Sequence, residues 1–156
     1  MAVDVTSETL IARPRTEVAA FAADPDNAPV WYANIKSIAW ESDPPLGLGT
    51  RVAFVAEFLG RRLAYTYEVV EFLPGQRLVM RTAQGPFPME TTYAWESTDD
   101  GATRMTLRNR GTPEGFSRLA APLMASSMRK ANRKDLARLK GLLEARTEPT
   151  SERGTT

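Results

Sequence analysis

Hydrophobic and polar residues alternate along much of the first 110 positions, as in β-strands that have one dry and one wet face. The segment 87–96 shows this pattern most clearly. Its inward set is large and mostly aromatic, and comprises Phe87, Met89, Thr91, Tyr93 and Trp95. Such a face must be covered by another element, so the pattern predicts a curved antiparallel sheet packed against a helix.

The same alternation predicts six further strands, separated by turn residues. They span Val3–Ile11, Ile35–Glu41, Thr50–Phe58, Arg62–Phe72, Arg77–Thr82 and Thr103–Arg110. Gly60-Arg61 and Asp99-Asp100-Gly101 indicate hairpin turns, because glycine adopts a positive φ without steric cost. Two short helices are expected after the first strand, one ending at Ala23 and one carrying Pro29–Tyr32.

One long amphipathic helix is predicted from about Gly115 to about Glu144, and it is large enough to cover the sheet. Pro122 should kink this helix or separate a short entry turn from the main helix. The polar segment 147–156 predicts a disordered tail, which leaves 1–146 as one domain. The apolar stripe of the helix contains Phe116, Leu119, Ala120, Leu123, Met124, Ser127, Met128, Ala131, Asp135, Leu139 and Leu142.

Composition excludes several kinds of chemistry. The chain has 156 residues and a net charge of +1, and it contains neither cysteine nor histidine. Thiolate nucleophiles, histidine bases and the usual zinc, copper and haem sites are therefore not expected. Carboxylate sites for magnesium or calcium stay open, but no calcium loop or phosphate loop is visible, so we expect no metal and no cofactor. Without a visible signal peptide or membrane span, the sequence predicts a cytoplasmic protein.

Several short phrases of the chain match a known superfamily. They are Ala12-Arg13-Pro14 followed by Val18 and Phe21, then Asp24-Pro25, Pro29-Val30-Trp31, Gly47-x-Gly49-Thr50 and Val70-Glu71-x-x-Pro74-Gly75-x-Arg77-Leu78. Over residues 3 to 145 the chain resembles the polyketide cyclase/dehydrase and lipid-transport branch of the START-like (SRPBCC) superfamily. The resemblance implies an α+β helix-grip fold, in which a curved sheet of about seven strands wraps the C-terminal helix. That superfamily has no universal catalytic motif, so the fold does not select a function.

The resemblance also implies a cavity between sheet and helix, lined by apolar residues of both. Its expected ligand is a small hydrophobic or aromatic molecule, lipid- or polyketide-like, held by one or two hydrogen bonds. The alternative is that these stripes simply form a packed core, which is the more common role of such residues. The candidate ligand-binding residues are Trp31, Phe54, Phe58, Tyr65, Tyr67, Met80, Phe87, Met89, Tyr93, Met105, Asn109, Met124 and Met128, with Ser127 as a further helix position.

Some of these residues have two interpretations. In the family, the region of Trp31 forms part of the pocket entrance, but Trp31 could equally plug the core beneath the sheet. Asn109 could orient a ligand or satisfy backbone groups where its strand ends. The hydroxyls of Tyr65 and Tyr67 could point into a pocket or lie at its rim.

The sequence distinguishes poorly between a carrier and an enzyme. A polyketide cyclase, aromatase or dehydratase would need a polar acid–base group buried in the cavity wall. Glu57 alternates outward, and the sequence identifies no convincing buried carboxylate and no inward carboxylate pair. Binding without chemistry is therefore favoured, and the catalytic residues of the alternative are unknown.

The predicted C-terminal helix is strongly basic. The segment between Gly115 and Thr147 contains eight basic and two acidic residues, which gives a local net charge of +6. This face could make a weak contact with an anionic membrane surface, or it could simply be solvated. Nucleic acid is not an expected partner, because aromatic residues do not interleave with the basic ones.

Overall fold

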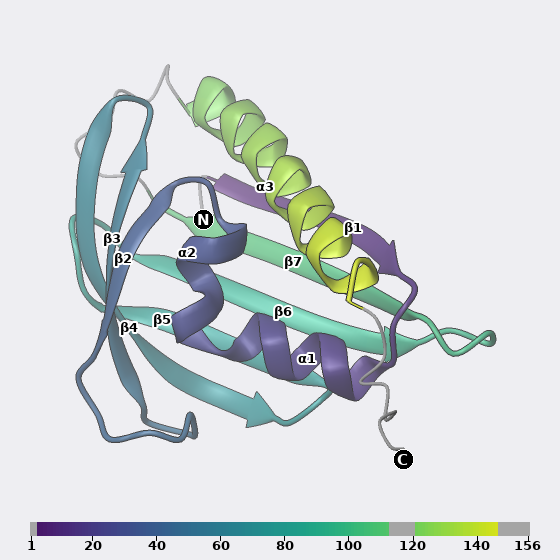
Figure 1. The fold of residues 1–156 in the computed structure, drawn as a ribbon. Helices are drawn as coiled ribbons and strands as arrows, with labels where there is room; N and C mark the ends of the chain where they lie inside the picture. The colour runs from purple at the N-terminus through teal and green to yellow at the C-terminus, as the bar shows by residue number, and fades with distance from the viewer. Residues whose placement is uncertain (1–2, 113–120, 147–156) are drawn as a thin grey trace, which may run out of the picture.

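The fold is a strongly curved sheet with helices on one side, described in a computed structural model for residues 3–112 and 121–146 (Figure 1). Two short helices follow the first strand, and the long helix comes after the last. The elements are β1 Val3–Ile11, α1 Arg15–Ala23, a 3₁₀ turn at Pro25–Asn27, α2 Ala28–Trp31, β2 Ile35–Trp40, β3 Arg51–Phe58, β4 Arg61–Leu73, β5 Arg77–Gln84, β6 Met89–Ser97, β7 Thr103–Gly111 and α3 Ala121–Glu144.

All seven strands form one antiparallel sheet in the order β1-β7-β6-β5-β4-β3-β2. The first and last strands of the chain pair directly, so β1 is an edge strand beside β7. Helix α3 packs along β1 and crosses the hollow of the sheet, while α1 and α2 lie below it (Figure 1). The predicted α+β helix-grip architecture, with short helices after the first strand, is confirmed.

The predicted inward faces of β5, β6 and β7 are also confirmed. Tyr93 on β6 and Met105 on β7 point into the protein and are 5% and 0% exposed. Leu78 and Met80 on β5 are buried on the same side. Burial of these apolar surfaces is the main favourable contribution to folding. Because side chains alternate between the two faces of a strand, a shift by one residue would expose the apolar set to water.

One predicted turn differs in the structure. The β3–β4 hairpin turns at Leu59-Gly60, one residue earlier than predicted, because Phe58 pairs with Arg61. Both turn residues have positive φ, which matches the twist of a two-residue hairpin. Pro122 lies in the first turn of the described α3. The predicted helix start at 115–120 and the tail 147–156 lie outside the described residues.

The buried face of α3 is rotated slightly from the predicted stripe. Leu123 and Leu142 are exposed, whereas Leu136 and Leu143, absent from the prediction, are buried. Helix α3 lies along the edge strand β1, so the helix face that turns toward β1 and the sheet becomes the buried face. No helix in residues 3–112 and 121–146 is long and apolar enough to cross a membrane.

The C-terminal end of α3 is attached to the β1–α1 connection. The Lys140 ammonium donates to the Leu10 carbonyl at 2.6 Å, and the Ala12 N–H donates to Glu144 at 2.8 Å. Lys140 also pairs with Glu144 at 2.7 Å, one helical turn away. These bonds fix the inclination of the helix over the sheet, which positions the space enclosed between them.

Candidate functional site

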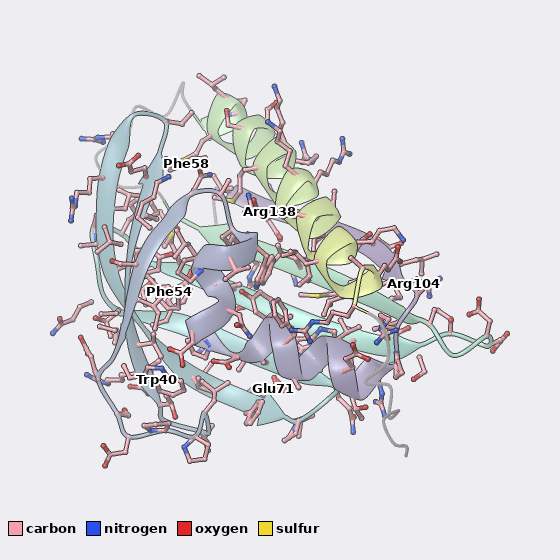
Figure 2. All side chains as sticks on the ribbon, viewed as in Figure 1. Trp40, Phe54, Phe58, Glu71, Arg104 and Arg138 are labelled. Carbon is pink, nitrogen blue, oxygen red and sulfur yellow. The ribbon has the colours of Figure 1, made fainter. Side chains whose placement is uncertain are left out.

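An internal cavity of about 120 Å³ lies between the sheet and the first half of α3. Strands β3 to β7 form its floor, the segment after α2 forms one wall, and α3 closes it from above. Phe54 and Phe58 lie along β3 on the side that faces α3 (Figure 2). The volume is comparable to the roughly 150 Å³ of an apolar cavity that admits one benzene molecule, and smaller than most drug-sized ligand sites.

Most of the residues predicted from the sequence come together around this space. Their side chains are aromatic on the sheet and thioether-rich on both sides, so they present an apolar and deformable surface. The lining contains Phe54, Phe58, Tyr65, Tyr67, Met80, Phe87, Met89, Tyr93, Asn109, Met124 and Met128. Their role in binding a ligand stays a prediction.

Trp31 and Met105 do not line the cavity, which corrects the expectation that they face it. Both are 0% exposed and belong to the packed core. Met105 points inward, but it belongs to the same buried cluster as Leu139 and Leu143 of α3 and is absent from the cavity lining. Trp31 packs on Tyr32, with ring centroids 4.1 Å apart, and acts as a plug beside the cavity.

One set of polar groups in the cavity is satisfied internally along the sheet. The Tyr67 hydroxyl lies 2.8 Å from the Thr91 hydroxyl, which donates to the Asn109 side-chain oxygen at 2.7 Å. Asn109 therefore satisfies a neighbouring side chain rather than the strand end. Burial raises the pKa of Tyr67 to about 12, so this phenol is neutral at physiological pH.

A second pair of phenols joins the wall after α2 to the sheet. The hydroxyls of Tyr32 and Tyr93 are 2.7 Å apart. Burial, the largest cause, raises the pKa of both phenols well above the usual value, and the nearby Asp135 carboxylate raises both further. Burial likewise raises the pKa of Tyr65, whose ring stacks on Phe54 with centroids 5.5 Å apart.

A buried carboxylate lies at one end of the cavity, contrary to the sequence interpretation. Asp135 on α3 is 3% exposed, and one of its oxygens accepts the Ala33 N–H at 3.0 Å. Burial raises the pKa of Asp135 to about 6, against the smaller opposing effects of the Ala33 bond, Arg138 and Lys134. Its position within the apolar stripe of the predicted helix was the signal that could have identified it.

Asn132, one turn before Asp135, is a second polar residue that sequence reasoning missed. It is 4% exposed, lines the cavity, and its amide nitrogen has no hydrogen-bond partner among the described residues. A buried amide without a partner is costly and therefore uncommon in native proteins. This position is where the cavity wall remains open to a polar contact.

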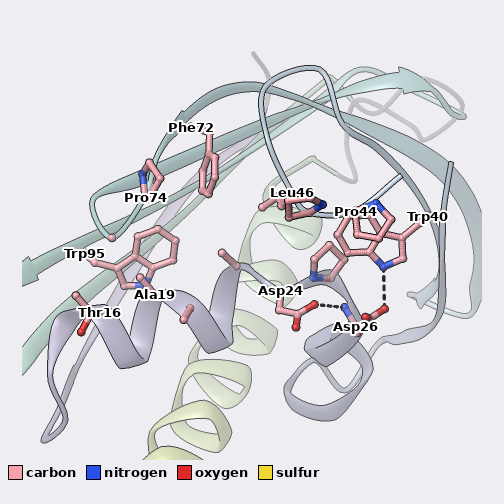
Figure 3. A pocket seen from close by; sticks show the side chains of 15 residues that line it. Thr16, Ala19, Asp24, Asp26, Trp40, Pro44, Leu46, Phe72, Pro74 and Trp95 are labelled. Atoms are coloured by element: carbon pink, nitrogen blue, oxygen red, sulfur yellow. Dashed lines mark hydrogen bonds between the residues drawn. The ribbon is translucent and has the colours of Figure 1, made fainter. Parts of the chain in front are cut away.

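A larger groove of about 600 Å³ lies outside this cavity, between α1, the β2–β3 loop and the β4–β5 turn (Figure 3). Its walls include Trp40, Phe72 and Trp95, and the Trp40 indole donates to Asp26 at 2.9 Å. None of the predicted binding residues lines it. The internal cavity is the candidate site because it combines apolar walls with several buried polar side chains.

The family assignment follows from the sequence match. A family model described as polyketide cyclase / dehydrase and lipid transport matches residues 2–144. The chain belongs to this family. No curated protein matches the sequence.

Several solved structures have a similar fold, and some of them are named for an activity while others are not. TTHA0849 from Thermus thermophilus superimposes with a TM-score of 0.78 at 21% identity, covering 92% of this chain and 99% of that one. The Zhui aromatase/cyclase from Streptomyces sp. R1128 gives 0.75 at 15% identity, covering 90% and 93%. A START superfamily protein from Mycobacterium smegmatis gives 0.71 at 13%, covering 89% and 98%. At these identities the likeness establishes the fold of this family member and not its activity.

Proposed function

We propose that this family member binds or transports a small hydrophobic or aromatic ligand in the cavity between the sheet and α3. The observation that carries the proposal is a partly enclosed space with aromatic and methionine walls, in which most polar groups are already paired. An apolar ring would gain contacts there without leaving those groups unsatisfied. The family description, which includes lipid transport, agrees with this proposal.

The size of the cavity restricts the ligand that fits without rearrangement. About 120 Å³ suits one aromatic ring, so a longer lipid- or polyketide-like molecule requires the cavity to widen. Met89, Met124 and Met128 line it and can change rotamer at low cost, because an unbranched thioether has three flexible bonds. We expect the larger ligands to enter by displacing these side chains.

A cavity-filling substitution tests the proposal. Ala131 lines the cavity from α3, so Ala131→Phe should occupy most of the space and abolish binding of toluene measured by NMR titration. Ala137→Phe on the exposed side of the same helix is the matched control and should bind toluene as the native protein does. The proposal fails if toluene leaves the signals of the native cavity residues unchanged, or if Ala131→Phe binds it equally well.

A second candidate function is an enzyme of the cyclase or dehydratase type that uses the same cavity. The observation that favours it is Asp135, a shielded carboxylate with a pKa raised to about 6, which is suited to exchange protons near neutral pH. A neighbour of similar fold is named an aromatase/cyclase. Incubating polyketide-like compounds with the native protein and with Asp135→Asn tests this candidate. A product formed by the native protein and lost in the variant, with binding retained, would favour the enzyme over the carrier.

We also propose that the outer face of α3 makes a weak contact with anionic membrane surfaces. Exposed basic side chains follow this face at helical spacing, namely Arg129, Lys130, Arg133, Lys134 and Arg138. Each basic residue near such a surface contributes roughly 1 kcal/mol, and salt screens this attraction. Sedimentation with phosphatidylserine vesicles should therefore decrease between low and high salt, and binding that is equal for neutral vesicles would contradict the proposal.

A further inference from the structure

Two polar side chains lie next to each other in the cavity wall with bonding capacity left over. Asn132 and Asp135 are three residues apart on α3, a spacing that places both side chains on the same helix face about 5–6 Å apart at Cβ. Both are at least nine-tenths buried, and both line the cavity. Their shared position makes them the polar end of an otherwise apolar space.

Their unused atoms are complementary. The Asn132 amide nitrogen is a donor without a partner among the described residues. Asp135 uses one oxygen to accept the Ala33 N–H, and its other oxygen accepts no hydrogen bond from the part of the chain that the structure describes. One open donor therefore lies beside one open acceptor, and a buried donor such as the Asn132 amide is normally satisfied by a partner.

The other polar groups of the cavity differ from this pair. Tyr67, Thr91 and Asn109 are bonded to one another. Asn34 and Tyr65 are only partly buried, so water can satisfy them. Among the cavity groups the buried Asn132 amide therefore most needs a polar partner, and the buried Asp135 carboxylate lies beside it.

We propose that Asn132 and Asp135 bind the polar head group of the ligand, and that this head group presents a hydrogen-bond acceptor beside a donor. Asn132 donates to the acceptor, and the Asp135 carboxylate accepts from the donor. A primary carboxamide, or a carbonyl with a neighbouring hydroxyl, has this arrangement. The apolar remainder of the ligand then lies against Phe54 and Met124. The inference rests on the proposed binding function and specifies the ligand class for it.

The charges near Asp135 set the conditions of the test. Tyr32 and Tyr93 lie near it as neutral phenols, while Arg138 and Lys134 on its own helix favour its ionised form. A donor on the ligand is bound best by the ionised carboxylate, since charge strengthens a hydrogen bond. The measurements are therefore made at pH 8, where the carboxylate is ionised.

Three single-ring probes separate the contributions of the head-group acceptor, the head-group donor and the apolar ring. Benzamide carries both acceptor and donor, acetophenone is nearly isosteric but lacks the donor, and toluene lacks both. NMR titration of the native protein should give benzamide a dissociation constant roughly tenfold lower than that of acetophenone. Asp135→Asn should remove this preference, because its amide places a donor opposite the donor of benzamide. Asn132→Leu should weaken benzamide and acetophenone roughly tenfold and leave toluene unchanged.

A matched control and the native probes keep the outcomes distinct. Ser126→Ala removes a hydroxyl from the exposed side of the same helix and should keep the preference for benzamide; its loss there would contradict the assignment to Asn132 and Asp135. If toluene binds but benzamide and acetophenone bind equally to the native protein, the head-group inference is overturned and the binding function stands. If not even toluene binds, both fail.

Discussion

The Ala33 N–H donates to the Asp135 carboxylate at 3.0 Å, across 102 positions of the chain. This bond joins the end of α2 to the middle of α3 and closes one end of the cavity. It satisfies one oxygen of a buried acid without neutralising its charge, so the folded protein holds a carboxylate that would be better solvated in the unfolded chain.

The stability of the protein should therefore depend on the ionisation of Asp135. Its pKa is about 6 in the folded state against 3.8 ordinarily, so the folded state holds the proton more tightly. This contribution to stability decreases as pH rises from about 4 to 6 and stays low above it. Asp135→Asn keeps an acceptor for Ala33, and should be more stable than the native protein at pH 8 but not at pH 4.

Urea unfolding at the two pH values measures this difference. Asp4→Asn is the matched control, because the Arg108 guanidinium lowers the pKa of Asp4 and its removal should not stabilise the protein at pH 8. Equal stability changes for Asp135→Asn at pH 4 and pH 8 would contradict the prediction.

The Tyr32–Tyr93 pair should show coupling between its two hydroxyls. Tyr32→Phe or Tyr93→Phe alone leaves the other buried hydroxyl without its partner, at a cost of about 1–3 kcal/mol. The double variant removes both groups, so it should cost less than the sum of the single variants. Thermal or urea unfolding of all four proteins measures the coupling, and strictly additive costs would show that the hydroxyls act independently.

Met105 and Met128 should differ in their contributions to stability, although both face inward. Met105 is 0% exposed in the packed core, so Met105→Ala should cost about 2–5 kcal/mol. Met128 lines the cavity and is only partly buried, so Met128→Ala removes fewer contacts and should cost clearly less. Urea unfolding gives both values. Similar losses would mean that Met128 is packed as tightly as a core residue.

The β3–β4 hairpin should be stabilised by a residue better suited to its turn. Leu59 has a φ of 51°, a left-handed conformation that disfavours leucine, and its side chain is exposed. Leu59→Asn should raise the unfolding free energy by about 0.5–1 kcal/mol, since asparagine tolerates this conformation in a two-residue hairpin. Leu123→Asn, at another exposed leucine with no such turn, is the control; a decrease in stability for Leu59→Asn would show that the leucine makes a contact that outweighs the backbone effect.

Sequence periodicity determined the succession of strands along the chain, the inward faces of β6 and β7, and the helix that covers them. These features are local: alternation assigns each residue to a face from its neighbours alone. The limit of this logic appears in β4, where a bulge at Val70 shifts the register, so that Val69 pairs with Met80 and Phe72 with Leu78. A bulge changes which residues share a face, and alternation cannot reveal it.

Whether an inward residue meets another side chain or a void was decided only by the tertiary structure. Met105 and Met80 both point inward, yet Met80 lines the cavity, whereas Met105 is 0% exposed and does not. Asn132 and Asp135 lie at the edge of that space, where a hydrophobic stripe would have predicted apolar contacts. Periodicity indicates which way a side chain points. The separation of sheet and helix depends instead on the curvature of the whole sheet and on the hydrogen bonds of Lys140 and Glu144 that hold α3 across it.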